Sequence, residues 1–415
     1  MQRTLITIGP RQVIGFCLAL TAFELLTYMA SDLVMPAMLD VTTELQADIR
    51  HVPNAFNLYL LGGICLQWLM GPLSDRWGRR RLLLIGCAIF GVACSAAFAA
   101  HSIEAFNLLR LLQGMGLGFV ISVSYPALQE VFCEADAVRL MALLGNVALL
   151  SPLLGPLLGS LLLQWLNWRE LFLALGLVAA MVWLGLYAWM PETVGVIRRD
   201  GQHQAPIPFS LKRTRQRYLA LLGNRRFFGA SLALGLMSLP LIAWIGLSPI
   251  LLIQLLGQTP LEYGLWQMPI FSAVIVGNLI LNRLLVTHAL PELIRIGLWP
   301  LCMGLVALLC CALLAAGPVP VVASLALYGV GLGICNATLY RLALFCTEDS
   351  KGLVSAMIGM ISIAVMGLGA SLIAAIGGGT RLDFFALLSA LGGLTCLPLL
   401  HGFLHDAKAA STKAQ

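Results

Sequence analysis

Two carboxylates stand inside the first long apolar run of the sequence, which covers residues 13–39. Glu24 and Asp32 are eight residues apart, and Tyr28 falls halfway between them. On a helix, this spacing places the acids about 80° apart around the axis and about 12 Å apart along it, so one face presents an acid, a phenol and a second acid. A charged side chain in the middle of a membrane helix costs about 2.5–3.5 kcal/mol. The pair is therefore predicted to be functional, exchanging protons or holding a cation.

Arg110, in a predicted helix at residues 104–133, lies at a depth similar to that of Asp32. Because an unpaired arginine inside a membrane is costly, we expect Arg110 to pair with Asp32 and to modulate its proton binding. Gln113 is one turn farther along and can hydrogen-bond the same group. A static ion pair that only fixes packing is the alternative. Glu24 has no comparable partner, which favours Asp32 as the proton-coupled acid and Glu24 as a contact for substrate, especially a cation.

The elements that position these residues are predicted to be membrane helices. Hydrophobic residues make up 60% of the 415-residue chain and charged residues 11%, and the mean hydropathy is +0.91. A soluble domain is about one quarter charged. Apolar runs long enough to span a bilayer recur along the chain. We therefore predict an all-α integral membrane protein with twelve transmembrane helices, at residues 13–39, 52–74, 82–100, 104–133, 136–165, 169–191, 225–253, 261–287, 291–316, 319–346, 351–377 and 383–405.

The sequence is internally repeated. GMGLG begins at Gly114 and GVGLG begins at Gly329, and the same offset along the chain carries Tyr125 onto Tyr340. Two parallel six-helix repeats are the plan of a transporter that rocks around a site between its halves. The predicted domains are two pseudo-symmetric six-helix bundles at 1–191 and 225–405, a cytoplasmic linker at 192–224 and a disordered tail at 406–415.

The repeat also shows where the ionisable chemistry lies. Under the offset that relates the two glycine runs, Glu24 and Asp32 fall opposite Leu239 and Leu247. The second half therefore lacks the acids, and proton exchange is expected in the first half.

The basic residues are distributed unequally between the loops. Most lie on one side of the predicted bundle, and only Arg50, Arg169 and Arg381 fall on the other. The positive-inside rule then predicts that both termini are cytoplasmic. The net charge of +6 serves topology and contact with the lipid bilayer, and no nucleic-acid partner is expected. Glu130 and Glu134, at the inner end of a helix, are expected to be solvated, with a charge network as the alternative.

Cysteine usage indicates no redox or metal chemistry. The eleven cysteines lie almost entirely in apolar segments, without the spacing of metal ligands. They are expected to pack as small side chains. We predict no disulfide, no metal site and no cofactor.

The loop after the second predicted helix reads GPLSDRWGRRR. Gly71 and Gly78 allow tight turns, Asp75 can cap a neighbouring helix, and Arg76 and Arg79 stay on the cytoplasmic side. This loop resembles the signature loop of the major facilitator superfamily. The resemblance implies the fold of that superfamily and a conformational role for these five residues.

The fifth predicted helix contains closely spaced prolines and glycines. Pro152 and Pro156 remove backbone hydrogen bonds, and Gly155 and Gly159 permit close approach of another helix. A kinked, closely packed helix can act as a gate, and packing alone is the alternative. The stretch resembles the antiporter motif of drug exporters, with Ser151 in place of the first glycine.

A narrower resemblance covers nearly the whole chain. The stretch ELLTYMASDLVMPAML is similar to the first helix of the MdfA-like multidrug/proton antiporters, which implies that Glu24 and Asp32 carry proton and substrate. The pattern R-x-x-Q-G at Arg110 resembles a superfamily motif whose arginine is implicated in proton coupling. Ser31 stands where that group has asparagine, so the substrate range stays open.

Polar and aromatic residues on several helices are candidates for substrate binding. For those outside the first helix, packing between helices is an equal alternative. The predicted set is Glu24, Tyr28, Asp32, Asn57, Gln113, Tyr125, Trp244 and Gln267.

These features predict a monomeric multidrug/proton antiporter of the bacterial inner membrane, exporting lipophilic cationic or neutral small molecules. The alternative is a dedicated proton-coupled exporter of one metabolite, such as a sugar, a siderophore or an amino-acid derivative. An enzyme is not expected, because the sequence has neither HExxH nor GxSxG. A sensor would need a sizeable soluble domain, and the polar stretches of this sequence are too short to form one.

Overall fold

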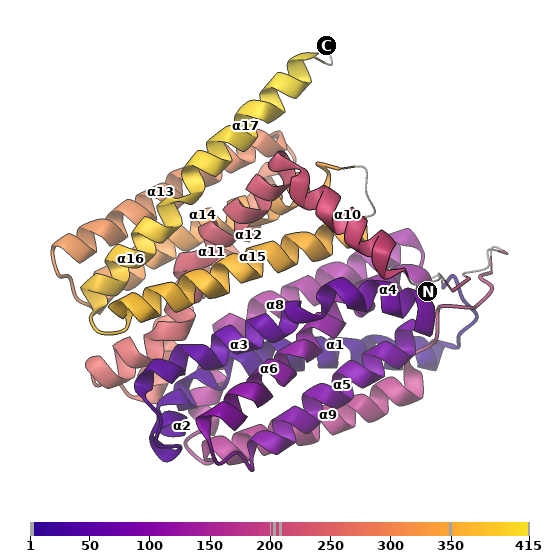
Figure 1. Ribbon diagram of the computed structural model, residues 1–415, viewed down its shortest axis with the longest axis horizontal. Coiled ribbons are helices and arrows are strands. Elements are labelled where there is room, and N and C mark those ends of the chain that lie inside the picture. Colours follow the sequence, from indigo (N-terminus) through magenta and orange to yellow (C-terminus); the bar gives the residue numbers. More distant parts are fainter. Residues whose placement is uncertain (1–3, 200, 202–204, 207–209, 348–350, 414–415) are drawn as a thin grey trace. The chain divides into compact units, whose positions relative to one another are not determined.

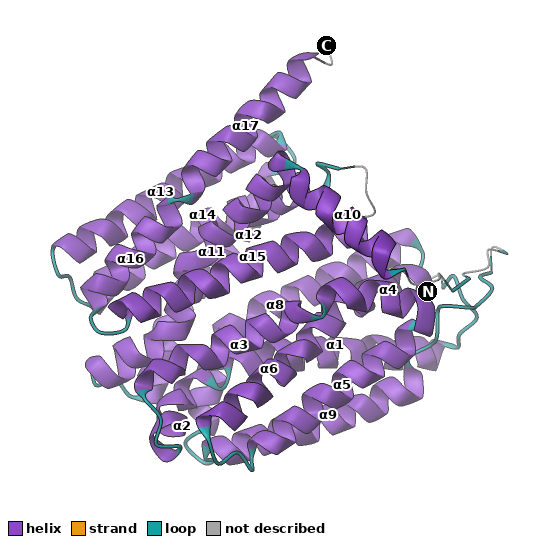
Figure 2. Cartoon of the chain, viewed as in Figure 1, coloured by secondary structure: helices purple, strands orange, loops and turns teal. Residues whose placement is uncertain are grey.

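The computed structural model describes residues 4–199, 201, 205–206, 210–347 and 351–413. Across these ranges the chain is helical, with no strand (Figure 2). Within the same ranges, ten helices are long and apolar enough to span a membrane, and there are eleven if one bent pair counts as a single span. The protein is therefore an all-α, multi-span membrane protein.

The chain divides into two compact units. The first comprises residues 1–47 and 58–211, and the second comprises residues 48–57 and 212–415. The start of the predicted helix 52–74 thus groups with the second unit.

The part of the chain before the linker is built from long helices joined by short helical turns (Figure 1). Its elements are α1 (Pro10–Asp32), η1 (Met35–Ala37), α2 (Met38–Glu44), η2 (Ile49–His51), α3 (Val52–Cys65), α4 (Gln67–Trp77), α5 (Arg79–Ala97), α6 (Ile103–Phe119), η3 (Val120–Ser124), α7 (Tyr125–Val131), α8 (Glu134–Leu162) and α9 (Trp168–Trp189). Within the first unit, α1 packs against α8 and α9, while α5 packs against α6 and α9.

The linker and the second unit are also helical. Their elements are α10 (Leu211–Gly223), α11 (Arg225–Ser248), η4 (Pro249–Leu255), α12 (Pro260–Leu284), α13 (Leu290–Leu313), α14 (Pro318–Leu344), α15 (Lys351–Ile373), η5 (Ala374–Gly378), α16 (Leu382–Leu394) and α17 (Cys396–Lys413). The linker region predicted at 192–224 therefore contains a helix, and α17 extends into the segment predicted as a disordered tail. In this unit, α14 packs against α12 and α13, and α11 packs against α15.

The first membrane span is not one continuous α-helix. Regular α1 ends at Asp32, and a short 3-10 turn, η1, separates it from α2. Pro36 has no N–H, so it cannot bond to the carbonyl of Asp32 four residues earlier. Instead, the N–H of Ala37 bonds to the carbonyl of Val34 at 3.0 Å. The single helix predicted at 13–39 is therefore broken directly after its second acid.

Two other spans before the linker are irregular, and the π-helices η4 and η5 interrupt two spans after it. The helices α3 and α4 bend by 42° at the break between them. The π-helix η3 joins α6 to α7 and ends directly before Tyr125. Single π-helical turns inside α-helices often occur at functional sites.

The repeated glycines hold equivalent helices together in the two units. A Cβ on Gly62 would meet the backbone carbonyl of Leu111, and a Cβ on Gly277, its equivalent in the repeat, would meet the carbonyl of Val330. Gly118 and Gly333 face backbone carbonyls in the same way. Small residues permit this backbone contact between membrane helices. The GxGxG runs therefore serve helix packing.

Candidate functional site

Both acids of α1 are buried. The side chains of Glu24 and Asp32 are 0% and 4% exposed, and Tyr28 between them is half-buried. Each acid is held by a hydroxyl group from a different helix of the first unit. The two carboxyls are therefore distinct sites on one helix.

Glu24 accepts a hydrogen bond from the phenol of Tyr125. The Tyr125 hydroxyl lies 3.1 Å from Oε1 of Glu24, and η3 immediately before Tyr125 sets the position of the ring. The other oxygen, Oε2, is buried and has no hydrogen-bond partner among the described residues. The prediction that Glu24 has no partner was wrong, because the fold brings the hydroxyl of Tyr125 to it. The open oxygen leaves Glu24 able to bind a proton or the donor group of a ligand.

Asp32 lies at the break that ends α1. Its Oδ2 accepts a hydrogen bond from Oγ of Ser151 on α8, at 2.8 Å. Arg110 on α6 is near enough to interact with Asp32 electrostatically. Ser31, the neighbour of Asp32, donates its hydroxyl to the carbonyl of Tyr28 at 2.7 Å and also lies close to the Asp32 carboxyl.

Arg110 is fully buried beside the backbone of α1. Its Nη1 donates to the carbonyl of Ala30 at 3.2 Å and to Oε1 of Gln113 at 2.8 Å. Its guanidinium also lies 4.7 Å from the centre of the Tyr59 ring, an arrangement in which a cation is attracted to the aromatic face. Gln113, one turn from Arg110, therefore hydrogen-bonds to the guanidinium itself. Ala30 lies two residues before Asp32 on α1, so the guanidinium that contacts its carbonyl brings positive charge near the Asp32 carboxyl.

The proline- and glycine-containing helix lies against the same end of α1. Both Pro152 and Pro156 are inside α8, which remains helical through them. A Cβ on Gly155 would lie 2.7 Å from the Cβ of Asp32, and a Cβ on Gly159 would meet the carbonyl of Leu33. The structure therefore places the proline- and glycine-containing stretch of α8, the predicted gate motif, directly against Asp32, a contact that sequence spacing alone could not establish.

The 71–81 loop forms a charge network at one end of the first unit. Arg79 pairs with Asp75 at 2.5 Å and with Glu130 at 2.9 Å. Its backbone N–H, at the start of α5, donates to Glu192 at 2.8 Å. Gly78, the residue before α5, has φ of +101°, which favours glycine. Arg76 lies in the last turn of α4 and is exposed, and Gly71 begins no tight turn because it lies inside α4.

Glu130 corrects an expectation about this region. It is 8% exposed and accepts hydrogen bonds from Arg79 and from the hydroxyl of Thr193, the latter at 2.5 Å. The prediction of a solvated residue was wrong, because Glu130 neutralises a buried arginine. The side chain of Glu134 lies outside the described residues.

The remaining substrate candidates lie in the second unit. Nε1 of Trp244 donates to Oε1 of Gln267 at 2.7 Å, and Nε2 of Gln267 donates to Ser248 at 3.1 Å. Trp244 and Gln267 are therefore in contact, and their polar groups hydrogen-bond to each other in a buried cluster. Asn57 donates to Oγ of Ser371 at 2.9 Å.

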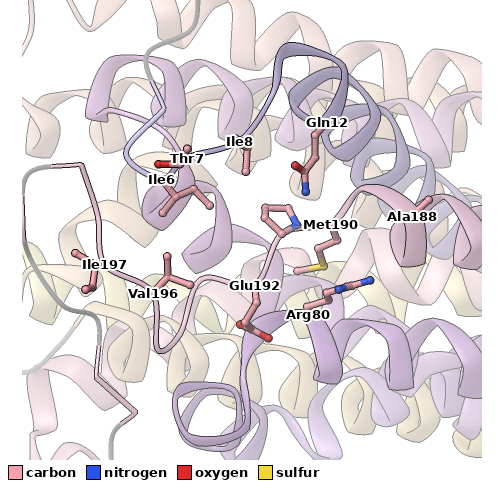
Figure 3. Close-up of a pocket in the computed structure, with 11 residues that line it drawn as sticks. Ile6, Thr7, Ile8, Gln12, Arg80, Ala188, Met190, Glu192, Val196 and Ile197 are labelled. Atoms are coloured by element: carbon pink, nitrogen blue, oxygen red, sulfur yellow. The ribbon is translucent and has the colours of Figure 1, made fainter.

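A cavity of about 310 Å³ opens in the first unit, away from both acids. Its walls are formed by Ile6, Thr7, Ile8, Gln12, Arg80, Ala188, Met190, Pro191, Glu192, Val196 and Ile197 (Figure 3). None of these residues is among the predicted proton or substrate contacts. The candidate site is therefore the buried face of α1, not this cavity.

Sequence similarity to known proteins indicates the family of the chain. The Major Facilitator Superfamily profile matches residues 20–374. The chain is 42% identical over 404 residues to a protein of Yersinia pestis named multidrug transporter MdfA, and 41% identical over 399 residues to the MdfA of Escherichia coli O6:H1; each comparison covers 95% of both chains.

Solved structures share the fold at low sequence identity. A D-xylose-proton symporter superposes with a TM-score of 0.73 at 14% identity, covering 93% of this chain and 97% of that one. The human organic anion transporter MFSD10 superposes with a TM-score of 0.65 at 16% identity, covering 95% of this chain and all of that one. From the profile match, the full-length similarity and the shared fold, we conclude that the chain belongs to the major facilitator superfamily.

Proposed function

We propose that this protein is a multidrug/proton antiporter of the bacterial inner membrane that exports lipophilic cationic or neutral compounds. Support comes from the 41–42% identity to proteins named multidrug transporters over 95% of the chain. The single observation that carries the mechanism is the pair of buried acids on one helix, Glu24 and Asp32. In the proposed topology twelve helices cross the membrane, both termini are cytoplasmic, and the protein works as a monomer.

The proposed mechanism is competition between proton and substrate for the acids. When the site opens outward, Asp32 takes a proton. A site with a neutral acid then reorients within the membrane more readily than a site with a charged one. When the site opens inward, a lipophilic substrate enters and the proton leaves to the cytoplasm. The driving force is about 1.4 kcal/mol per pH unit and about 2.3 kcal/mol per charge for each 100 mV.

The two acids take different roles in this proposal. Asp32, beside Arg110 and the gate motif of α8, is the proton-coupled carboxyl. Glu24, whose Oε2 lacks a partner among the described residues, meets the substrate. Trp244 and Gln267 of the second unit are proposed as further substrate contacts, and Arg79 with Asp75 as part of the conformational machinery.

Replacing Asp32 with asparagine tests the proposal. In liposomes with an imposed pH gradient, we expect Asp32→Asn to abolish substrate uptake driven by the gradient, because the amide cannot carry the proton. The control is Asp40→Asn, which changes an exposed acid of the same span on α2, and its transport should match the wild type. Gradient-driven transport by Asp32→Asn at the wild-type rate would remove Asp32 from the mechanism.

A further inference from the structure

Ser151 connects the proton-coupled acid to the gate helix. Its hydroxyl lies 2.8 Å from Oδ2 of Asp32, and the side chain is 0% exposed. One turn and two turns farther along α8, Gly155 and Gly159 lie against Asp32 and Leu33. Ser151 is therefore a polar group on the face of α8 where Gly155 and Gly159 contact α1.

The residue after Ser151 creates a second acceptor for its hydroxyl. Pro152 has no N–H, so the carbonyl of Ala148, four residues before it, receives no helical hydrogen bond from it. Serine hydroxyls in helices donate to carbonyls three or four residues earlier, and Ala148 is three residues before Ser151. Ser160 on the same helix makes a bond of this kind to the carbonyl of Pro156, at 2.7 Å.

We propose, on the basis of the proton exchange proposed above for Asp32, that Ser151 is a positioning residue that bonds this acid in both protonation states. When Asp32 is charged, the serine hydroxyl donates to it. When Asp32 binds a proton, the acid donates to Oγ of Ser151, and the serine hydroxyl turns to the carbonyl of Ala148. The serine keeps its own proton throughout, since a hydroxyl both donates and accepts. Protonation of Asp32 thereby changes the hydrogen bonding of the proline-containing turn of α8.

Few other titratable groups surround Asp32. Arg110 of α6 interacts with it electrostatically, and so does the phenol of Tyr59 on α3. Its own helix carries Tyr28 and Glu24.

The two helices that pack most extensively on α1 add no charge at this depth. The sequence of α8 contains no titratable side chain after Arg139, and that of α9 contains none between Glu170 and Tyr187. Among the described side chains of α8, Ser151 is the one that hydrogen-bonds to Asp32.

The variant Ser151→Ala tests this inference through the pH dependence of substrate binding. Ser151→Ala loses a bond in both protonation states, and the bond to the charged acid is the stronger one, so the difference amounts to up to about one pH unit. We expect the pH of half-maximal binding to move upward by that amount, because the carboxylate loses a donor and keeps its proton to higher pH. Ser151→Thr, which retains the hydroxyl, should restore the wild-type profile. The matched control is Ser160→Ala, which removes a buried hydroxyl that donates to the carbonyl of Pro156 within α8 and should leave the profile unchanged.

A spectroscopic measurement separates this role from simple packing. In infrared difference spectra, the carbonyl band of protonated Asp32 is identified by its absence in Asp32→Asn. We expect this band to shift to higher frequency in Ser151→Ala and to stay in place in Ser160→Ala. Ser151→Gly provides a second hydroxyl-free variant if the alanine variant does not fold.

The outcomes distinguish this inference from the proposed function. Wild-type protein that shows no transport driven by a pH gradient would refute proton exchange itself. Wild-type coupling, together with an unshifted pH profile and an unshifted carboxyl band in the folded Ser151 variants, would overturn the role of Ser151 and leave the antiporter proposal standing.

Discussion

The two acids of α1 share a helix but not an environment. Glu24 is held by one phenol and keeps a buried oxygen without a partner among the described residues, whereas Asp32 is held by a serine and lies near a guanidinium. An open, desolvated oxygen is suited to a ligand that arrives with its own donor or charge, because burying it unpaired has a free-energy cost. This difference in surroundings supports the assignment of substrate contact to Glu24.

Removing the phenol that contacts Glu24 tests this assignment. Tyr125→Phe deletes the hydroxyl 3.1 Å from Oε1, and a hydrogen bond to a charged group contributes about 1.5–3 kcal/mol. Without this donor, the Glu24 carboxylate is less stable relative to the protonated acid, and the protonated acid does not attract a cation. We therefore expect the dissociation constant of a monovalent cationic substrate to rise about tenfold or more. A neutral substrate should bind almost unchanged. Calorimetric titration of both substrates gives the comparison.

The repeat supplies the control for this experiment. Tyr340 occupies the equivalent position in the second half and hydrogen-bonds to Ser355 at 2.5 Å. Tyr340→Phe should not discriminate between the two substrates. Equal losses for cationic and neutral substrates in Tyr125→Phe would contradict a charge-specific role for Glu24.

At the level of residues, the sequence pointed to the charged side chains that the structure buries, but not to the groups that contact them. The cost of burying a charge predicts that Glu24, Asp32 and Arg110 are functional, and the structure buries all three. Their neighbours depend on how helices distant in sequence pack, and no local pattern assigns Tyr125 to Glu24 or Ser151 to Asp32. Ser151 did carry one signal, since it replaces a glycine in a motif that otherwise needs small residues.

At the level of elements, the apolar runs predicted the helices but not their interruptions. Pro36 lies within the predicted span 13–39, and its missing N–H could have predicted the break after Asp32. The π-helix η3 has no such simple sequence signal, although the proline after Tyr125 limits regular bonding there. These two irregularities lie beside the acids of α1, and the π-helices η4 and η5 interrupt two spans of the second unit as well.

The contact between α1 and α8 makes a prediction about helix packing. A Cβ on Gly159 would meet the backbone carbonyl of Leu33, and overpacking of this kind typically costs about 1–3 kcal/mol. We expect Gly159→Ala to lower the melting temperature in detergent and to slow transport, because α8 must move away from the end of α1. Differential scanning fluorimetry and liposome uptake measure the two effects.

Gly367→Ala is the matched control for this variant. Gly367 also lies inside a long helix, α15, but a Cβ there would meet no atom within 4 Å. Alanine is the better helix former, so this variant should be as stable as the wild type or slightly more stable. Unchanged stability and transport in Gly159→Ala would show that the contact between α8 and α1 can relax freely.

At the scale of the whole molecule, the two halves share glycine contacts between equivalent helices, but the acids of α1 have no counterpart in the second half. Equivalent glycines join α3 to α6 in the first unit and α12 to α14 in the second, and this arrangement was predictable from the constant offset between the repeated glycine runs. Leu239 and Leu247, at the positions equivalent to the acids, are 4% and 1% exposed. In the proposed mechanism, a single acidic helix therefore serves the whole transporter, and proton and substrate compete there.

Competition at a single acidic helix predicts how transport responds to voltage. If one proton enters per cycle, export of a monovalent cation moves no net charge, whereas export of a neutral compound moves one positive charge inward. Each 100 mV then contributes about 2.3 kcal/mol to export of the neutral compound and nothing to export of the cation. In liposomes with a potassium diffusion potential and no pH gradient, we therefore expect the potential to accelerate only the neutral substrate. A pH gradient without a potential should accelerate both, and equal responses of the two substrates to the potential would contradict exchange at one proton-coupled acid.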